Sequence, residues 1–309
     1  MRAAIYNEYG DPEVLQIVQC DVPVPKGNEI KIEVVASSVT PGDVANRRGN
    51  SFLAKLFTGI KTPRNPILGY EYSGIVTEIG TDVTKFQDGD EVFGTTGRKG
   101  GAHAEYVCID EHGMVAHKPV GLSFESAATL PIGSLTSLYF LRKASVGEGH
   151  AVLLYGASGS VGTAAVQILK NIGASVTAVC SKANHDLVRS LGADIMIDYE
   201  EQDFRTNGVK YDFVFDAVGK ISVQSCKESL RDTGLFISVY MPISHVFHGR
   251  VVGGIVEEKP EDINLIKSLA EQGILVPVID RIFKLGDISL AHEYVELGHK
   301  TGNVVIQIR

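Results

Sequence analysis

A glycine-rich segment with the spacing of a phosphate-binding turn lies in the middle of the chain. Residues 151–156 read AVLLYG, residues 156–162 read GASGSVG, and a helical pattern runs from Val161 to Ile172. In the first turn of a βαβ unit, free backbone N–H groups and the positive end of a helix dipole can bind a pyrophosphate. An ordinary tight turn uses the same glycines, but a second strand, SVTAV at 175–179, follows in the right order. The segment therefore predicts dinucleotide binding by Ala157, Ser158, Gly159, Ser160, Val161 and Gly162.

The residues after that second strand distinguish between the two nicotinamide dinucleotides. NAD-binding proteins place an Asp or Glu on the ribose diol about 20 residues past the glycines. This chain has CSKAN at 180–184, with no carboxylate. The Ser181 hydroxyl and the Lys182 ammonium suit a 2′-phosphate, with Lys182 or Asn184 holding it, so the sequence favours NADPH over NADH. Alternatively, Ser181 caps the next helix and Lys182 is solvated, and both descriptions can hold at once.

Composition and charge exclude several classes of protein. The 309 residues are 44% hydrophobic, and 29 Lys and Arg against 37 Asp and Glu give a net charge of −8, so no basic field exists to collect nucleic acid. No apolar run reaches the roughly 18 residues of a membrane span, and the start, MRAAIYNEYGD, lacks the pattern of a secretory leader. The four cysteines lie far apart, which predicts neither a zinc cluster nor a disulfide framework. We therefore expect a folded cytoplasmic protein.

The first third of the chain and the remainder predict different elements. Short runs at 29–35, 72–79, 90–93 and 103–109 alternate apolar and polar residues between Gly and Pro, which is typical of a mostly antiparallel β domain. After Pro119, apolar strands alternate with helical patterns, which predicts an α/β fold with a doubly wound parallel sheet. The later elements expected are helices at 184–191, 222–231, 261–272 and 290–297 and strands at 195–198, 211–219, 235–240, 251–256, 276–283 and 304–308.

Motifs in a fixed order give the chain a family resemblance. Residues 40–49 (TPGDVANRRG) are similar to "NPxDxxxRxG", residues 69–76 (GYEYSGIV) to "GHExxGxV", and residues 101–107 (GAHAEYV) to "GxxAEYV". With the glycine segment placed behind a β domain, the sequence resembles the medium-chain dehydrogenase/reductase superfamily, in its zinc-independent, quinone oxidoreductase-like branch. The likeness runs end to end. It implies a GroES-like catalytic domain of residues 1–120 and 262–309, a Rossmann NADPH-binding domain of residues 121–261, an active cleft at their junction and a homodimer.

The resemblance also widens the set of residues expected at the cofactor. It implies Thr136 by the nicotinamide or ribose and Tyr199 by the adenosine end, and it adds Ala217 and Val239 near the ends of the strands expected at 211–219 and 235–240. Asp43 joins this set as a group that organises the cleft rather than as a base. The lysine of the family's terminal "GKxV" motif is replaced by Asn303, which removes a phosphate contact that the family sometimes makes.

The chain departs from the alcohol dehydrogenase branch at the zinc ligands. Thr40 stands where that branch has a cysteine and Tyr70 where it has a histidine, and the four cysteines of a structural zinc lobe are missing near residues 94–101. A hydroxyl and a phenol do not replace thiolate and imidazole in a tetrahedral zinc site, so no metal is expected. His103 lies nearby in sequence and is expected to be a structural or surface residue.

Without a Lewis acid, NADPH chemistry suits an acceptor that is already activated by conjugation, such as a quinone, enone or enal. The developing enolate oxygen then needs a hydrogen-bond donor. Thr40 and Tyr70 are the candidates, with a turn hydroxyl and a packed aromatic as their structural alternatives. Tyr240, after a Rossmann strand, either narrows the pocket or supplies a proton.

Other interpretations remain open at this stage. The chain could be an enoyl-thioester reductase of the same fold, or an NADPH-binding sensor or structural protein without significant catalysis. The segment from Ser51 to Pro66 carries Phe52, Leu53, Leu56 and Phe57, which predict either an apolar cover over the cleft or ordinary core packing. A cover of that kind would favour small, apolar or planar substrates.

Overall fold

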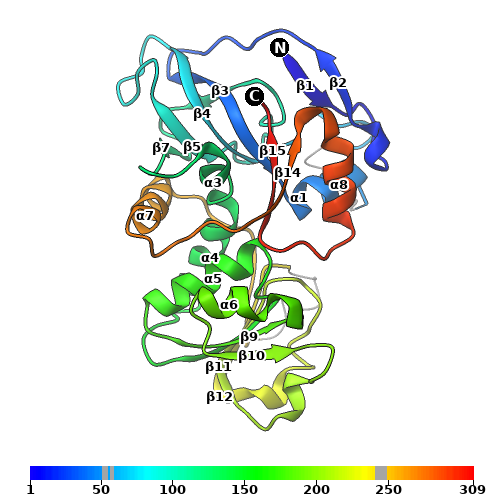
Figure 1. Cartoon of the computed structure of the whole chain (residues 1–309), viewed down its shortest axis with the longest axis vertical. Coiled ribbons are helices and arrows are strands. Elements are labelled where there is room, and N and C mark those ends of the chain that lie inside the picture. Colours follow the sequence, from blue (N-terminus) through cyan, green and yellow to red (C-terminus); the bar gives the residue numbers. More distant parts are fainter. Residues whose placement is uncertain (51–54, 56–58, 241–248) are drawn as a thin grey trace. The chain divides into compact units, whose positions relative to one another are not determined.

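In the computed structural model, the described residues are 1–50, 55, 59–240 and 249–309, and they divide into two units (Figure 1). Unit 1 comprises Met1–Ile132, Glu258–Glu271 and Pro277–Arg309. Unit 2 comprises Gly133–Glu257 and Gln272–Val276. Unit 1 is thus assembled from segments on both sides of unit 2 in the sequence. The proposed cover residues Phe52, Leu53, Leu56 and Phe57 lie outside the described part of the chain.

Unit 1 is built on a mixed sheet with the strand order β14-β15-β3-β4-β5-β7, in which β6 also pairs with β3. The neighbours are antiparallel except for the parallel pair β14 and β15. Strands β1 and β2 form a separate antiparallel ribbon. The strands of unit 1 are β1 (Arg2–Ile5), β2 (Gln16–Gln19), β3 (Glu29–Val39), β4 (Glu71–Ile79), β5 (Glu91–Thr95), β6 (Tyr106–Asp110), β7 (Val115–His117), β14 (Ile279–Lys284) and β15 (Asn303–Gln307).

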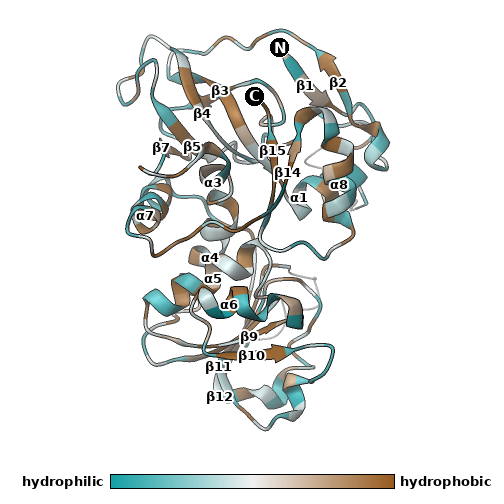
Figure 2. Ribbon diagram, in the orientation of Figure 1, coloured by the Kyte–Doolittle hydropathy of each residue, from teal (hydrophilic) through white to brown (hydrophobic). Residues whose placement is uncertain are grey.

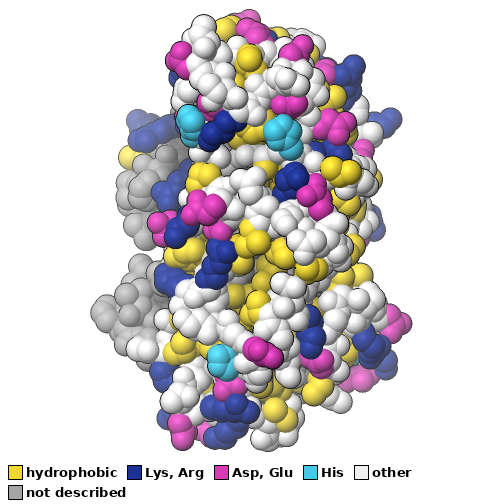
Figure 3. Space-filling view, turned by 90° about the vertical axis from the view of Figure 1, so that its left-hand side faces the viewer, with side chains coloured by type: hydrophobic (Ala, Val, Ile, Leu, Met, Phe, Trp, Pro, Cys, Tyr) yellow, Lys and Arg dark blue, Asp and Glu magenta, His cyan; other side chains and the backbone are white. Residues whose placement is uncertain are grey.

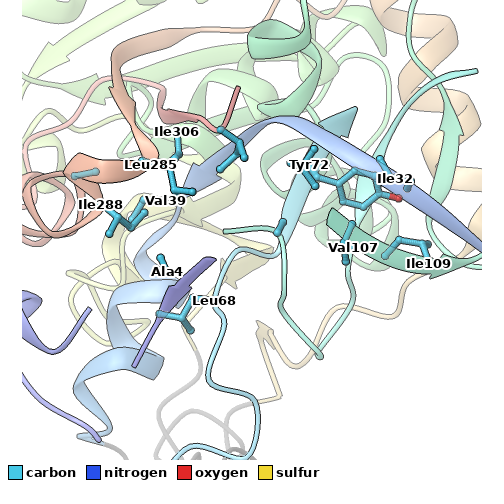
Figure 4. Packing of buried hydrophobic residues seen from close by; sticks show 14 of the residues in the cluster. Ala4, Ile32, Val39, Leu68, Tyr72, Val107, Ile109, Leu285, Ile288 and Ile306 are labelled. Carbon is cyan, nitrogen blue, oxygen red and sulfur yellow. The ribbon is translucent and has the colours of Figure 1, made fainter. Parts of the chain in front are cut away.

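The helices of unit 1 close a hydrophobic core against this sheet. They are η1 (Pro12–Val14), α1 (Pro41–Arg48), α3 (Phe124–Ala128), α7 (Pro260–Glu271), η6 (Leu285–Asp287) and α8 (Ile288–Glu296). Figure 4 shows part of the core, where Leu285 and Ile288 lie with Val39 and Ile306, and Tyr72 lies near Ile32. In Figure 2, β3 is largely apolar, whereas α7 carries many hydrophilic residues. Burial of these apolar side chains is the main stabilising contribution to such a unit.

The junction between β3 and α1 shows how local sequence positions the first candidate residues. In β3, Ile30, Ile32 and Val34 are buried at every second position, as predicted. The strand ends before Thr40, which caps α1 with its side chain, and Pro41 takes the first helical position. Gly49 ends the helix with a left-handed φ of 60°.

Unit 2 contains a parallel sheet with the order β10-β9-β8-β11-β12-β13. This is the doubly wound order of dinucleotide-binding folds, in which the strand order reverses beside the first strand, here β8. The strands are β8 (Ala151–Tyr155), β9 (Ser175–Cys180), β10 (Ile195–Asp198), β11 (Tyr211–Asp216), β12 (Leu230–Ser238) and β13 (Val251–Val252), and the helices are α4 (Pro131–Lys143, from Gly133 in unit 2), α5 (Ser160–Asn171), η2 (Lys182–Asn184), α6 (His185–Ser190), η3 (Phe204–Thr206) and η4 (Lys227–Ser229). Ligands of such sheets bind outside the carboxyl ends of the strands, at the point where the strand order reverses, here between β8 and β11.

One sequence prediction in unit 2 is wrong, and one helix of the structure was not predicted. The helix expected over 222–231 is wrong, because Ser222 and Ser225 exchange side-chain and backbone hydrogen bonds of 3.1 and 3.2 Å that form a turn. Only η4 follows, and β12 begins at Leu230. Helix α4 was not predicted, because its sequence is apolar on most sides and shows no polar stripe before Arg142.

The predicted α/β class, with a mostly antiparallel β unit and a doubly wound parallel sheet, is confirmed. No described helix is both long enough and apolar enough to cross a membrane. On the face drawn in Figure 3, Lys and Arg side chains lie among Asp and Glu side chains.

Candidate functional site

The glycine segment forms the turn between β8 and α5 and leaves backbone donors at the start of the helix. The amides of Gly156 and Ala157 donate to Val179 O at 3.0 and 3.1 Å, which ties the turn to β9. Helix α5 begins at Ser160, and its N-cap Gly159 supplies no side-chain hydrogen bond. The first-turn N–H groups of a helix have no partner within the helix. The turn at the predicted position therefore presents backbone donors and the positive end of a helix dipole, which are the groups that an anion could bind.

The glycines of this turn have distinct steric roles. A Cβ on Gly162 would lie 2.1 Å from Gly156 O, so Gly162 is required for the helix to pack against the turn. At Gly159 the nearest atom to such a Cβ would be 3.7 Å away, so this position is open. Gly156 has φ +83°, which favours glycine. A pyrophosphate could thus approach the backbone at Gly159, where a Cβ would make only an ordinary van der Waals contact, whereas Gly162 is closely packed.

The residues predicted for the 2′-phosphate lie together at the end of β9. Asn184 Nδ2 donates to Ser181 Oγ at 3.2 Å. Ser181 occupies the N-cap position of η2 without making a side-chain cap, so the capping alternative holds for its position only. Lys182 Nζ lies 3.7 Å from Glu201 Oε1, and the two side chains are 74% and 63% exposed. Glu201 was not predicted as a neighbour of Lys182, because it follows the adjacent strand β10 and is distant from Lys182 in the sequence.

The remaining cofactor candidates of unit 2 are gathered by the parallel register. The carboxyl ends of neighbouring strands pair Asp198 with Cys180, Asp216 with Tyr155, and Asp216 with Ser238. The residues placed at this edge are Tyr199, Ala217, Val239 and Tyr240, beside the glycine turn and Ser181. Thr136 is half-buried on α4, whose neighbouring Ser137 donates to Val161 O at 2.9 Å.

Asp216 and Tyr240 shape the turn after β11. The carboxylate of Asp216 accepts from the amides of Val218 and Gly219 at 3.0 and 2.8 Å. A Cβ on Gly219, which has φ +83°, would lie 2.8 Å from the Tyr240 ring, so the ring rests on this glycine. Tyr240 remains 48% exposed.

Unit 1 holds Thr40 and Asp43 in a closed hydrogen-bond arrangement. Asp43 Oδ2 accepts from the Thr40 amide at 2.8 Å and from Thr40 Oγ1 at 2.6 Å, and Oδ1 accepts from Gly69 N at 2.8 Å. Asp43 is fully buried and Thr40 nearly so. The Thr40 hydroxyl donates its proton to Asp43. This favours the interpretation of Thr40 as an ordinary turn hydroxyl over that of a donor to a substrate. The geometry assigns Asp43 to organising this turn, with no surface open to a cofactor.

Tyr70 is arranged differently from Thr40. Its phenolic oxygen accepts from Asn46 Nδ2 at 2.7 Å, so the phenol proton is not used in this bond. Burial, with Asp43 and Tyr6 close by, raises the pKa of Tyr70 far above its usual value. Tyr70 is therefore a neutral hydrogen-bond donor. Asn46 lay in a quoted motif, but nothing in the sequence indicated its contact with Tyr70.

The residue that directly follows Tyr70 is a buried carboxyl, Glu71, which interacts electrostatically with Lys300. Glu71 has no exposed surface, and its oxygens accept from Ser38 Oγ and, at 2.8 Å, from Ile132 N. Burial raises the pKa of Glu71 to about 7, and Lys300 acts in the opposite direction. Burial likewise lowers the pKa of Lys300 to about 8, while Glu71 raises it. Asn303, which replaces the lysine of the family's "GKxV" motif, donates through its side-chain amide to Val278 O at 3.1 Å.

His103 belongs to a second buried cluster of unit 1, which matches its predicted structural role. Its Nε2 lies 2.9 Å from Ser38 O, and its ring meets that of His292 edge-on with centroids 5.8 Å apart. Burial, His103 and Arg47 hold the pKa of His292 well below its usual value. Arg47 pairs with Glu296 at 2.6 Å. Across the described residues, no set of three or more His, Cys, Asp and Glu side chains could hold a metal ion.

Comparisons with known proteins agree with this architecture. Residues 26–119 match the family described as the alcohol dehydrogenase GroES-like domain, and residues 191–306 match that described as zinc-binding dehydrogenase. The chain is 33% identical over 99% of its length to 2-methylene-furan-3-one reductase of Solanum lycopersicum, covering 79% of that protein. It is 31% identical over 99% of its length to the chloroplastic NADPH-dependent alkenal/one oxidoreductase of Arabidopsis thaliana, again covering 79%.

A solved structure gives the same result for the whole fold. The quinone oxidoreductase of Coxiella burnetii superposes with a TM-score of 0.90 and 34% identity, over 100% of this chain and 99% of that one. Identity at this level over complete chains establishes common membership. The chain therefore belongs to the medium-chain dehydrogenase/reductase superfamily, in its quinone oxidoreductase-like branch, and is an NAD(P)H-dependent oxidoreductase.

Proposed function

We propose that this chain is a zinc-independent, NADPH-dependent reductase of quinones or α,β-unsaturated carbonyl compounds. Three similar proteins bear the names of a furanone reductase, an alkenal/one oxidoreductase and a quinone oxidoreductase. The observation that carries the proposal is the phenol of Tyr70, which is neutral and accepts from Asn46, while within the described part of the chain its own proton is donated to no acceptor.

Tyr70 acts in this proposal as the donor to the substrate's carbonyl oxygen. A conjugated carbonyl gathers negative charge on that oxygen as its β-carbon is reduced, and a donor placed there stabilises the charge. NADPH, when bound, supplies the hydride for this reduction. Thr40 is less suited to the same task, because Asp43 takes its proton. Tyr240 stays a second candidate for the pocket wall or a proton source.

The choice of NADPH rests on the end of β9. Ser181 and Lys182 offer a hydroxyl and a cation, Asn184 offers an amide, and the ribose carboxylate typical of NAD-binding proteins is missing from this strand end. The turn from Ala157 to Gly162 would hold the pyrophosphate. Thr136, Tyr199, Ala217 and Val239 complete the proposed cofactor contacts.

Zinc independence rests on the chemistry of the residues at the ligand positions. Zinc in proteins is bound by thiolate, imidazole or carboxylate groups. Thr40 donates to Asp43, and Tyr70 holds its proton tightly, so neither residue fits as a ligand. The match to the family described as zinc-binding dehydrogenase covers residues 191–306 and does not include these two positions. A cytoplasmic location and a homodimer remain predictions that come from the sequence and the resemblance.

A stopped-flow screen of cofactor oxidation tests the proposal. NADPH and NADH would each be tried with quinones, enones, enals and acyl-CoA esters, with and without a chelator. We expect turnover of enones, enals or quinones with NADPH that the chelator does not change. Faster turnover of acyl-CoA esters would make the chain an enoyl-thioester reductase, and cofactor binding without any turnover would make it a sensor or structural protein.

The role of Tyr70 has its own test in Tyr70→Phe. Loss of the hydroxyl should lower kcat by roughly 10- to 100-fold, because one hydrogen bond to the developing oxyanion is removed. Cofactor affinity should not change. A Tyr70→Phe enzyme with the kcat of the wild type would contradict the assignment of the donor.

A further inference from the structure

Asn46 and Tyr70 form a pair in which the direction of the hydrogen bond decides what the phenol can do. Asn46 lies on α1 and is half-buried, and Tyr70 lies directly before β4. The amide nitrogen Nδ2 of Asn46 is 2.7 Å from the phenolic oxygen. An amide nitrogen only donates, so the phenol oxygen accepts and its own proton points elsewhere.

Among residues 1–50, 55, 59–240 and 249–309, no group around the pair accepts that proton. Asp43, on the same helix, already accepts bonds from Thr40 and Gly69 at 2.6 to 2.8 Å. Asp43, Tyr6 and Tyr9 are the titratable groups that act on Tyr70, and each favours its neutral form. The Tyr70 carbonyl accepts from Thr96 N at 2.9 Å, which fixes the backbone. Among the described residues, Asn46 is thus the group that sets the orientation of the hydroxyl.

We infer that Asn46 is a positioning residue for the reaction: by donating to the Tyr70 oxygen, it keeps the phenol proton available to the carbonyl oxygen of the substrate. This inference rests on the proposed function. It assigns a task to a side chain that stands at an unspecified position of the "NPxDxxxRxG" motif. A phenol whose oxygen already accepts one hydrogen bond is also a stronger donor, because successive bonds polarise one another.

The isosteric variant Asn46→Asp reverses the hydrogen bond. A carboxylate only accepts, so it would take the phenol proton away from the substrate. We expect kcat to fall roughly tenfold or more relative to the wild type. Asn46→Ala removes the orienting bond but leaves the proton free, so it should lose less activity than Asn46→Asp. If only size and packing mattered, Asn46→Asp would lose less activity than Asn46→Ala, because Asp has nearly the shape of Asn. The expected order of activity loss is therefore the opposite of the order that packing alone predicts.

The pH profile separates positioning from a merely structural role. When the new carboxyl of Asn46→Asp is protonated, it can again donate to Tyr70, so kcat should recover as the pH falls. Neither the wild type nor Asn46→Ala has this group, so neither should show the recovery. Asn50→Asp, just beyond the end of α1, makes the same change of charge on an exposed side chain and should behave as the wild type.

Two outcomes would overturn the inference, and they are distinguishable from each other. If Tyr70→Phe is inactive but Asn46→Asp and Asn46→Ala lose activity equally, without recovery at low pH, then Asn46 does not orient the proton. If Tyr70→Phe retains full activity, the donor assignment fails and the positioning role fails with it. Urea unfolding of each variant verifies that the fold is intact.

Discussion

The two units place their polar groups in opposite ways. In unit 1, Asp43, Glu71 and His292 are buried, and burial is the main cause of the shifted pKa values of Glu71 and His292. In unit 2, the proposed cofactor contacts are backbone N–H groups of a glycine turn and exposed side chains such as Lys182. This difference indicates which properties of the protein each unit controls. Substitutions in unit 1 should change chemistry and pH dependence, whereas substitutions in unit 2 should change packing of the turn or cofactor affinity.

The largest effect is expected at Gly162 in the turn of unit 2. In Gly162→Ala, the new Cβ would lie 2.1 Å from Gly156 O, and backbone must move to admit it. Such overpacking outweighs the helical preference of Ala, and we expect a loss of about 2 kcal/mol or more in the free energy of unfolding. Urea unfolding followed by circular dichroism measures it.

Gly159→Ala is the matched variant three residues earlier in the same turn. Its Cβ would lie 3.7 Å from the nearest atom, so stability should hardly change. The methyl would instead occupy the open side of the turn and weaken NADPH binding roughly tenfold, because the phosphates must approach the backbone there. Equal stability of Gly162→Ala and the wild type would show that the turn is less closely packed than described.

A pH-dependent stability change of comparable size is expected in unit 1. The folded-state pKa of Glu71, about 7, lies above its ordinary value of 4.5, so ionising this group opposes folding. Its contribution to stability is present below 4.5 and is lost as the pH rises through about 7. Glu71→Gln removes that loss, and relative to the wild type it should gain on the order of 3 kcal/mol between the two ends of this window.

Urea unfolding at a series of pH values below the Lys300 pKa of about 8 tests this prediction. Glu105→Gln is the control with the opposite sign, because the Arg2 backbone N–H and guanidinium lower the pKa of Glu105. A Glu71→Gln difference that is independent of pH would mean that Glu71 ionises normally in the folded protein.

The sequence predicted the parts of the fold that depend on local pattern. The apolar strands β8, β9 and β11 and the alternating residues of β3 were visible as runs and periods. The segment 222–231 was mistaken for a helix, because only the structure reveals the reciprocal bonds of Ser222 and Ser225. Helix α4 was not predicted, because a helix that is apolar on most sides shows no amphipathic periodicity in its sequence.

In the candidate site, too, the residues of one continuous segment could be predicted from the sequence, whereas contacts between distant residues could not. The glycine turn is one continuous segment, so its residues could be listed from the sequence. The partner of Tyr70 is 24 residues away on α1, and Glu71 interacts electrostatically with Lys300, which is near the other end of the sequence. Such contacts depend on how strands and helices pack, and no spacing in the sequence encodes them. The sequence therefore identified Tyr70 as a candidate without indicating which atom its proton could reach.

A smaller effect is expected for Lys182→Ala in unit 2. Lys182 is 74% exposed, so its attraction for a 2′-phosphate is partly screened by solvent. We expect NADPH affinity to fall roughly tenfold and NADH affinity to stay unchanged, since only one of them carries that phosphate. Fluorescence titration with each dinucleotide measures both constants. Equal losses for the two would remove the support for the 2′-phosphate site.

The smallest effect, and the sharpest test of charge in unit 2, is expected at Glu201. Its carboxylate lies 3.7 Å from the Lys182 ammonium and competes with a phosphate for that cation. Unit charges about 4 Å apart interact by about 1 kcal/mol in water. Glu201→Gln should therefore tighten binding of adenosine 2′,5′-bisphosphate roughly two- to fivefold, leave 5′-AMP unchanged, and lose its advantage at high salt. Calorimetric titration needs no turnover, and Glu200→Gln is the neighbouring control. Tightening of both nucleotides alike would mean that Glu201 acts on the site as a whole, and no change in either would mean that solvent screens the pair completely.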